Sequence, residues 1–279
     1  MFETFKTFLF DGDGVLYKES EPLPGAIEFL NFLRNQSKQV FILTNNSTKT
    51  RNEFQSKLNS FGIEINIEHI LTSSFLTADF IARKSPNARI YVIGEDGLKQ
   101  ELKSAGLEVL NSWNETNEED FFDFNFGEVD YVITGMDRKI NFTKITRATH
   151  ILQNYENVGF IATNGDFTFP TIKGLVPGGG AMIKILEDLS HRTVDLIIGK
   201  PHQEMYRRAI ELSNSTVDET IMFGDRIETD IYGANQIGIT TCLVLTGVTK
   251  MQDLEKLNDD NSPTIIMNDL KDAFDSLSR

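Results

Sequence analysis

The chain has 279 residues, enough for two domains, and its formal net charge of −14 comes from 27 basic and 41 acidic residues. That acidic balance argues against nonspecific nucleic-acid binding, which needs a basic surface. No apolar run is long enough for a membrane span, and the N-terminal stretch lacks the basic region of a signal peptide. Cys242 is the only cysteine, which rules out an intrachain disulfide and fits a cytoplasmic protein.

Short apolar, β-branched runs alternate with amphipathic stretches along the chain, beginning with a strand and then a helix over Ala26–Asn35. Strands that alternate with helices in this way predict a parallel sheet in an α/β fold. The acidic segment Asn111–Phe126 is predicted to be a surface helix or loop. The predicted strands are Thr7–Phe10, Gln39–Thr44, Arg89–Ile93, Tyr131–Thr134, Gly159–Thr163, Asp195–Gly199, Thr220–Phe223 and Thr241–Leu245.

Four polar clusters directly follow four of these predicted strands. They read DGDG at 11–14, TNNS at 44–47, GKP at 199–201 and GDRIETD at 224–230. In open parallel sheets, ligands bind outside the carboxyl ends of the strands. We therefore expect the four clusters to meet in one crevice although they lie far apart in the sequence.

The first cluster holds two carboxylates, Asp11 and Asp13, that repel each other unless a cation lies between them. Mg²⁺ favours such oxygen ligands together with a substrate phosphate. A turn with two solvated aspartates is the plain structural alternative. A calcium EF-hand is excluded, because Val15 occupies the fifth loop position and Pro22 the twelfth.

The other three clusters each allow a functional and a structural interpretation. The groups of Thr44–Ser47 suit phosphate oxygens, but they also suit a helix N-cap. Lys200 is able to neutralise a carboxylate and a phosphate, or is an ordinary surface lysine. Asp225 is a natural further Mg²⁺ ligand, and Asp230 either binds through water or orients Lys200. The alternative for this last pair is an acidic loop that caps the following helix.

Taken together, DGDGVL, TNNS, GKP and GDRIETD resemble the four ordered motifs of the haloacid dehalogenase superfamily of phosphohydrolases. The segments TGMDRKINFTKI, ATNGDFTFPT and GLVPGGGAMIKILE resemble its p-nitrophenylphosphatase-like branch, which includes phosphoglycolate phosphatases. The resemblance implies a Rossmann-like, parallel-sheet core over residues 1–83 and 192–279. It also implies an inserted α/β cap over residues 84–191, and a homodimer formed through that cap.

The resemblance further implies a role for each motif residue. Asp11 is then the nucleophile, Asp13 the general acid and base, and Lys200 the residue that stabilises charge. Mg²⁺ is bound by Asp11, the main-chain carbonyl of Asp13, and Asp225, with Asp230 in support. These roles stand as expectations at this point.

The side chains expected to contact substrate are Thr44, Asn45, Asn46, Asn164, Phe169 and Lys200. Specificity is expected from the cap segments Asn164–Thr171 and Gly135–Arg138. Pyridoxal phosphate phosphatases of this branch carry a substrate-facing histidine where this chain has Phe169, which argues against dedicated pyridoxal phosphate hydrolysis.

The expected reaction is Mg²⁺-dependent hydrolysis of a small phosphorylated metabolite through an aspartyl-phosphate. Candidate substrates are p-nitrophenyl phosphate, phosphoglycolate, glycerol phosphate and nucleotides. Two alternatives stay open at this point. One is transfer of the phosphoryl group to an alcohol, and the other is a non-catalytic phosphate-binding protein.

Overall fold

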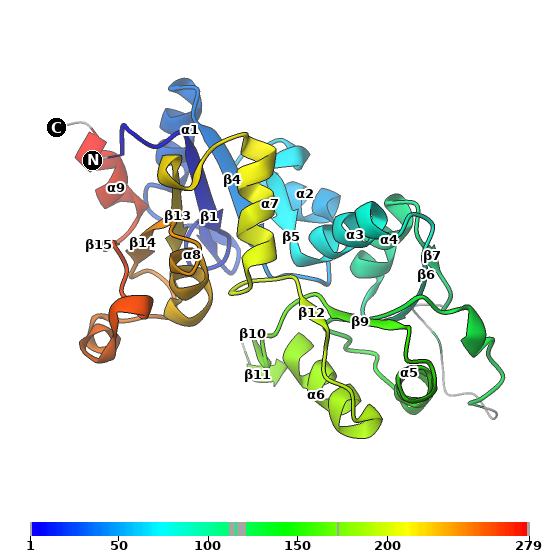
Figure 1. Cartoon of the computed structure of the whole chain (residues 1–279). Coiled ribbons are helices and arrows are strands. Elements are labelled where there is room, and N and C mark those ends of the chain that lie inside the picture. Colours follow the sequence, from blue (N-terminus) through cyan, green and yellow to red (C-terminus); the bar gives the residue numbers. More distant parts are fainter. Residues whose placement is uncertain (1, 112–114, 116–120, 172, 278–279) are drawn as a thin grey trace. The chain divides into compact units, whose positions relative to one another are not determined.

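The computed structural model describes residues 2–111, 115, 121–171 and 173–277 (Figure 1). The chain forms two compact units. The first unit comprises residues 1–44, 52–71 and 200–279, and the second comprises residues 45–51 and 72–199. The chain therefore leaves the first unit and returns to it, as an inserted domain requires.

The first unit is built on a six-stranded sheet in the order β15-β14-β13-β1-β4-β5. Its central strand, β1, pairs in parallel with β4 and β13, and β14 and β15 continue the parallel pairing. The strands are β1 (Thr7–Asp11), β4 (Gln39–Thr44), β5 (Ile70–Thr72), β13 (Thr220–Gly224), β14 (Thr240–Val244) and β15 (Ile265–Met267). A short antiparallel ribbon follows β1 and consists of β2 (Tyr17–Lys18) and β3 (Glu21–Pro22).

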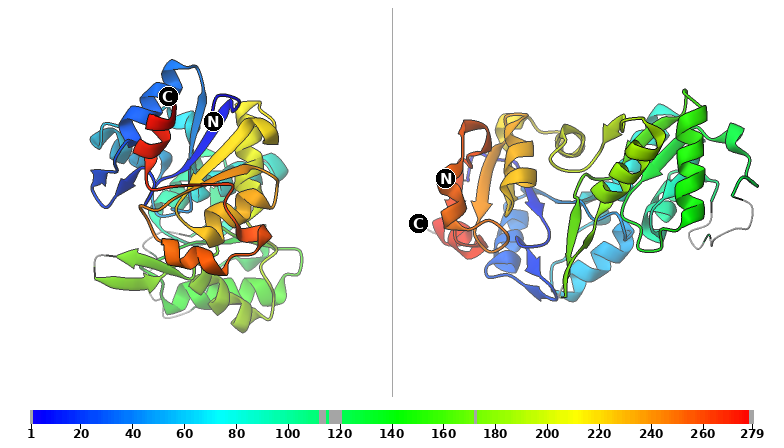
Figure 2. Two further views of the ribbon diagram at one scale, coloured as in Figure 1. Left: turned by 90° about the vertical axis from the view of Figure 1, so that its left-hand side faces the viewer. Right: turned by 90° about the horizontal axis from the view of Figure 1, so that it is seen from below.

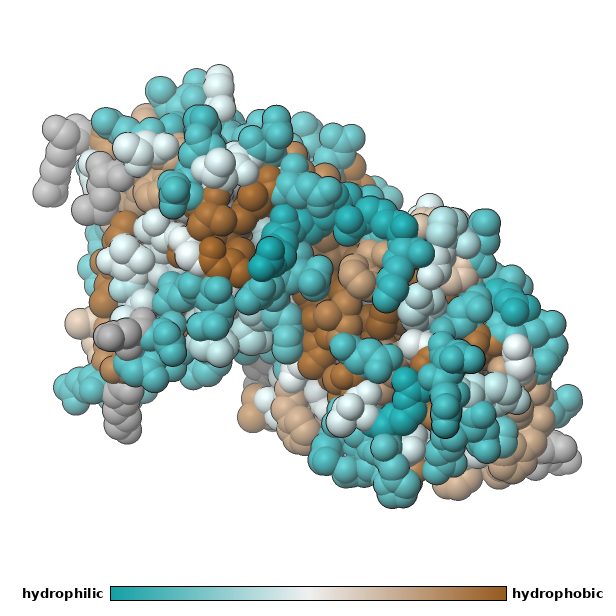
Figure 3. Space-filling model, viewed as in Figure 1, coloured by the Kyte–Doolittle hydropathy of each residue, from teal (hydrophilic) through white to brown (hydrophobic). Residues whose placement is uncertain are grey.

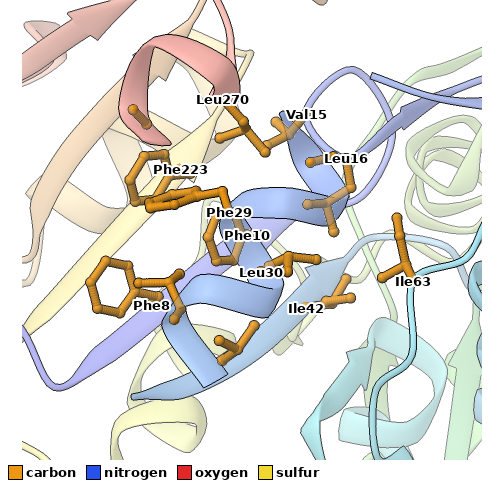
Figure 4. Close-up of a cluster of buried hydrophobic side chains, with 14 of the residues drawn as sticks. Phe8, Phe10, Val15, Leu16, Phe29, Leu30, Ile42, Ile63, Phe223 and Leu270 are labelled. Atoms are coloured by element: carbon orange, nitrogen blue, oxygen red, sulfur yellow. The ribbon is translucent and has the colours of Figure 1, made fainter. Parts of the chain in front are cut away.

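Helices cover both faces of this sheet (Figure 2). They are α1 (Ala26–Asn35), α2 (Arg51–Ser60), α7 (Gln203–Ser213), α8 (Tyr232–Asn235) and α9 (Leu270–Leu277). Alternate residues of a strand point to opposite faces, so Phe8 and Phe10 of β1 share one side. They pack there with Phe29 of α1 and Phe223 of β13 (Figure 4), and the rings of Phe10 and Phe223 stack 4.9 Å apart. This aromatic layer anchors the strand that ends at Asp11.

The second unit has its own five-stranded sheet in the order β12-β9-β8-β6-β7, again paired in parallel. Helices α5 and α6 pack together on one face, and α3 packs against α4. The strands are β6 (Arg89–Ile93), β7 (Glu108–Val109), β8 (Tyr131–Thr134), β9 (Gly159–Ala162) and β12 (Leu196–Ile197), with a hairpin of β10 (Thr168–Thr171) and β11 (Gly174–Pro177). The helices are α3 (Ser73–Lys84), α4 (Asp96–Ser104), α5 (Phe142–Asn154) and α6 (Gly179–Ser190).

Side-chain caps fix where two of these helices begin. The Thr72 hydroxyl accepts a hydrogen bond from the Phe75 N–H at the start of α3. The Asn141 carboxamide does the same for the Lys144 N–H at the start of α5. Each cap satisfies a backbone donor that has no partner inside the helix.

The predicted α/β fold class is confirmed, and the observed helix Ala26–Asn35 has its predicted bounds. The predicted strand Asp195–Gly199 is shorter, and as β12 it joins the second sheet by pairing with β9. Residues 72–84 belong to the second compact unit because α3 packs on α4, and residues 192–199 belong to it because β12 pairs with β9. The domain boundaries at 84 and 191 stay a prediction. Most of the predicted surface segment Asn111–Phe126 lies outside the described residues.

The surface seen in Figure 3 is largely hydrophilic, with apolar patches on each unit. Exposed apolar side chains of the second unit include Phe142, Phe167 and Leu175. Among the described residues, no helix has both the length and the apolar character that a membrane span requires.

Candidate active site

Asp11, the last residue of β1, forms a buried ion pair with Lys200. The Lys200 Nζ lies 2.5 Å from the Asp11 Oδ1, and the Lys200 side chain is only 3% exposed. The same Nζ donates to the Leu43 carbonyl oxygen at 3.2 Å. Because Leu43 is the register partner of Asp11 on β4, the ammonium is held across two neighbouring strand ends.

Asp230 holds Lys200 from the other side. Its Oδ1 lies 2.7 Å from the Lys200 Nζ. Its Oδ2 accepts hydrogen bonds from the main-chain N–H groups of Asp225 at 3.2 Å and of Arg226 at 3.1 Å. Asp230 lies in the π-helical turn η4 (Ile227–Ile231) that follows β13. Both of its oxygens are therefore engaged, one in placing the ammonium and one in shaping the loop.

Asp225, which directly follows β13, supplies the third carboxylate of the cluster. It is 1% exposed, and its Oδ2 accepts a hydrogen bond from the Val248 N–H at 2.7 Å. Its Oδ1 is buried and has no hydrogen-bond partner among the described residues. A buried carboxylate oxygen without a partner is costly, and this is the type of ligand that a divalent cation takes.

The carboxylates of Asp11, Asp225 and Asp230 offer ligand atoms that all lie within 4.8 Å of one another. Since both Asp230 oxygens are already bound within the protein, Asp11 and Asp225 are the better ligands of the three. The cluster fits a hard divalent cation such as Mg²⁺ in charge and in donor type. The Asp13 carboxylate is not part of this group. The family resemblance implies only the main-chain carbonyl of Asp13 as a metal ligand.

The charges of the cluster act on one another. Burial, together with Asp230 and Asp225, raises the pKa of Asp11 to about 8 against the opposing charge of Lys200. Burial and Asp230 also raise the pKa of Asp225, to about 6. Burial by itself would lower the pKa of Lys200, but Asp11 and Asp230 raise it overall, so Lys200 stays protonated. One ammonium thus faces three carboxylates, and a bound divalent cation would balance the excess negative charge.

Two glycines leave room for the Asp225 carboxylate. A Cβ at Gly247 would lie 1.8 Å from the Asp225 Oδ2, and a Cβ at Gly14 would lie 2.7 Å from the same atom. Gly14 also has a φ of +84°, in the left-handed region that favours glycine. No side chain fits at either position while Asp225 stays where it is.

Substitution Gly247→Ala is therefore expected to displace the Asp225 carboxylate. The predicted result is a weakening of Mg²⁺ binding by about 10- to 100-fold, the size of effect seen when the supports of a metal ligand are changed. Calorimetric titration of the folded variant with Mg²⁺ measures it. Gly127→Ala is the matched control, because the nearest atom to its added Cβ lies 4.0 Å away. Unchanged Mg²⁺ affinity in Gly247→Ala would contradict this reading of the site.

Asp13 and Thr44 complete the predicted residues of the first unit. Asp13 lies in the loop after β1 and is exposed, and partial burial raises the pKa of its carboxyl group. Thr44 ends β4 and is 8% exposed. Asp13 is thus a carboxylate outside the buried ion cluster and close to solvent.

The remaining predicted residues belong to the second unit, where two of them share a partner. The side-chain amides of Asn45 and Asn164 each donate to the Asp166 Oδ2 at 2.9 Å. Asp166 lies within the segment Asn164–Thr171 from which specificity was expected, but it was not singled out as a site residue. The Asn46 Oδ1 accepts a hydrogen bond from the Thr48 N–H at 3.0 Å.

Phe169 lies on β10 and is 41% exposed. Two main-chain groups that support the carboxylate cluster, the Leu43 carbonyl and the Val248 N–H, were not predicted from the sequence. Main-chain groups carry no residue-type signal, so only the three-dimensional structure identifies them.

Comparisons with known proteins place the chain in a family. The family model of haloacid dehalogenase-like hydrolases matches residues 8–108, and a second, HAD-hydrolase-like model matches residues 197–273. An acid sugar phosphatase of Staphylococcus saprophyticus is 35% identical over 277 residues, covering 99% of this chain and 100% of that protein. The 5'-nucleotidase YutF of Bacillus subtilis is 34% identical over 258 residues, covering 91% of this chain and 94% of that protein.

Solved structures show the same relationship. A p-nitrophenyl phosphatase from Archaeoglobus fulgidus superposes with a TM-score of 0.87 at 34% identity, covering 98% of this chain and 99% of that one. A glycerol phosphate phosphatase from Mycobacterium tuberculosis, in complex with calcium, gives a TM-score of 0.82 at 27% identity, covering 96% of this chain and 74% of that one. Because these similarities span nearly the whole chain, the protein belongs to the haloacid dehalogenase-like hydrolase family, in its phosphatase branch.

Proposed function

We propose that this chain hydrolyses phosphate monoesters of small molecules, with Asp11 as a covalent nucleophile and Mg²⁺ as cofactor. The observation that carries the proposal is the buried cluster in which Lys200 lies between Asp11 and Asp230, with Asp225 beside them. Proteins of similar sequence and structure are named acid sugar phosphatase, 5'-nucleotidase, p-nitrophenyl phosphatase and glycerol phosphate phosphatase. Their substrates are the first candidates for this chain.

In the proposed mechanism, an Asp11 oxygen attacks phosphorus in line with the leaving group. Asp13 protonates the leaving oxygen, and it later takes a proton from the water that hydrolyses the aspartyl-phosphate. Lys200 stabilises negative charge on the phosphoryl oxygens and keeps Asp11 in position. Asp230 acts through Lys200 and the loop 225–226, so it is a positioning residue. Two carboxylates are needed because the nucleophile must stay ionised while the acid must hold a proton.

Asp11 and Asp225, with the main-chain carbonyl of Asp13, would hold the cation. When bound, Mg²⁺ would neutralise part of the phosphate charge and favour the ionised form of Asp11. The orphaned Oδ1 of Asp225 supports this assignment.

We further propose that Thr44, Asn45 and Asn46 contribute to phosphate binding, and that Asn164 and Phe169 contribute to substrate selection. The first unit is then the catalytic core and the second the cap. A homodimer formed through the cap and a cytoplasmic location complete the proposal. Sedimentation at working concentration tests the dimer, and a protein that is monomeric throughout would argue against it.

Metal dependence is the direct test of the proposed chemistry. Removal of divalent ions with EDTA is expected to lower kcat/KM at least about 100-fold, because the cation offsets several kcal/mol of charge in phosphoryl transfer. Added Mg²⁺ is expected to restore the activity. Phosphate release from a panel of sugar phosphates, nucleotides, phosphoglycolate, glycerol phosphate and p-nitrophenyl phosphate measures it. A panel without Mg²⁺-dependent phosphate release would count against the proposed function.

A further inference from the structure

A polar cavity lies in the first unit, away from the carboxylate cluster. It has a volume of about 550 Å³ and is lined in part by Lys38 and Val40, at the start of β4. Leu43, whose carbonyl binds Lys200, lies near the other end of the same strand. About four residues of strand, ~13 Å, separate the two places. The cavity is therefore at the amino end of β4, whereas Asp11 lies at the carboxyl end of the neighbouring strand β1.

The cavity wall is positively charged in a strongly acidic chain. Arg34 and Lys38 line it, against one acidic residue, Glu64. Among the described residues, no carboxylate forms an ion pair with either cation, and the oxygens they contact are neutral. Arg34 contacts the Glu64 carbonyl and the side-chain oxygen of Asn31. The Lys38 Nζ donates to the carbonyl oxygens of residues 3 and 5, at 2.8 and 2.6 Å.

These contacts leave donors for a ligand. A guanidinium has five N–H donors and an ammonium three, and neutral carbonyls use some of them without cancelling the charge. The amides of Asn59 and Asn66 add uncharged donors to the lining. An Arg fork beside a Lys suits the tetrahedral oxygens of a phosphate, which accept several charge-assisted hydrogen bonds at once.

The rest of the lining is neutral or apolar. His69 stacks on Phe41 with ring centroids 4.6 Å apart, and burial lowers its pKa, so its ring adds no charge at neutral pH. Val40 and Ile65 give the cavity an apolar wall beside the cations. The lining therefore combines an anion site with room for a small organic group.

We propose that this cavity is a second phosphate site. It binds inorganic phosphate or the phosphate group of a small metabolite at the amino end of β4, away from Asp11. The inference does not depend on the proposed hydrolysis, because it rests on Arg34, Lys38 and the cavity alone.

Amide-resolved NMR titration of the full-length protein with inorganic phosphate separates this site from the carboxylate cluster. Saturable shifts are expected at residues 34–40 and 59–69, independently of any shifts at residues 11–14 and 225–230. A parallel titration with a non-hydrolysable alkylphosphonate distinguishes the two sources of the phosphate group. Equal affinity indicates free phosphate, and tighter binding of the alkylphosphonate indicates a metabolite that uses the apolar wall.

The variant Arg34→Gln/Lys38→Gln is expected to weaken phosphate binding in the cavity at least about 10-fold, through loss of charge-assisted hydrogen bonds. Arg207→Gln/Lys271→Gln removes the same charges from exposed positions of the same unit and is expected to bind as the parent does. If loss of the Lys38 contacts unfolds the chain, the single variant Arg34→Gln is tested in its place, because Arg34 is exposed. Absence of shifts at 34–40 and 59–69, or equal shifts in the cavity variants, would overturn the proposal.

Discussion

Asp11→Asn is expected to lower kcat at least about 10⁴-fold, the scale of loss on removing a covalent nucleophile. The amide has nearly the shape of the carboxylate, but it is a poor nucleophile and a weak ligand for a cation. Steady-state hydrolysis of p-nitrophenyl phosphate with saturating Mg²⁺ measures the change. Circular dichroism and thermal unfolding establish that the variant is folded.

Asp275→Asn is the matched control for this experiment. Asp275 pairs with Lys271 on the surface of α9, where the carboxylate is 48% exposed. The same chemical change is expected to leave kcat within about twofold there, since exposed ion pairs contribute little. Substantial activity in Asp11→Asn would remove Asp11 from the role of nucleophile.

Lys200→Met is expected to have the second large effect, on stability as well as on turnover. It removes the ammonium from between Asp11 and Asp230, both of which lie in a largely buried environment. Breaking a buried pair by removing one partner costs about 3–5 kcal/mol, because it leaves a buried charge uncompensated. Urea unfolding measures the free energy of unfolding, and kcat is expected to fall about 10³-fold through loss of transition-state charge stabilisation.

Two further variants test whether the expected loss of stability comes from the buried charges around Lys200. Lys271→Met removes an ammonium that is 62% exposed and is expected to change stability by less than about 1 kcal/mol. Adding Asp230→Asn to Lys200→Met removes one of the stranded carboxylates and is expected to recover part of the lost stability. Equal stability of Lys200→Met and the parent protein would show that this ion pair does not hold the strand ends together.

Much of the carboxylate cluster was predictable because its residues lie at the ends of predicted strands. Asp11 ends β1 and Asp225 directly follows β13. These two strands are neighbours in a parallel sheet, so their carboxyl ends lie side by side. Lys200 was expected to follow a strand of the same sheet. It instead follows β12 of the second sheet, and reaches Asp11 from the segment that leads into α7.

Other parts of the site depend on contacts that the sequence does not display. Gly247 comes to lie against Asp225 only when the loop after β14 folds back. The partner that Asn45 and Asn164 share, Asp166, lies more than 100 residues from Asn45 in the sequence. The place of α3 in the second compact unit also follows from its packing on α4, which no local pattern reveals. Local hydrophobic periodicity predicts which segments form helices and strands, whereas long-range packing determines which of these elements contact one another.

The most direct test of the central claim is to trap the covalent intermediate on Asp11. The enzyme is mixed with phosphate-labelled substrate and Mg²⁺, quenched in acid within one turnover, and digested for peptide mapping. The account predicts labelled acyl phosphate on the peptide that contains Asp11, and none in Asp11→Asn. Label on a different residue, or full turnover without labelled enzyme at any quench time, would contradict it.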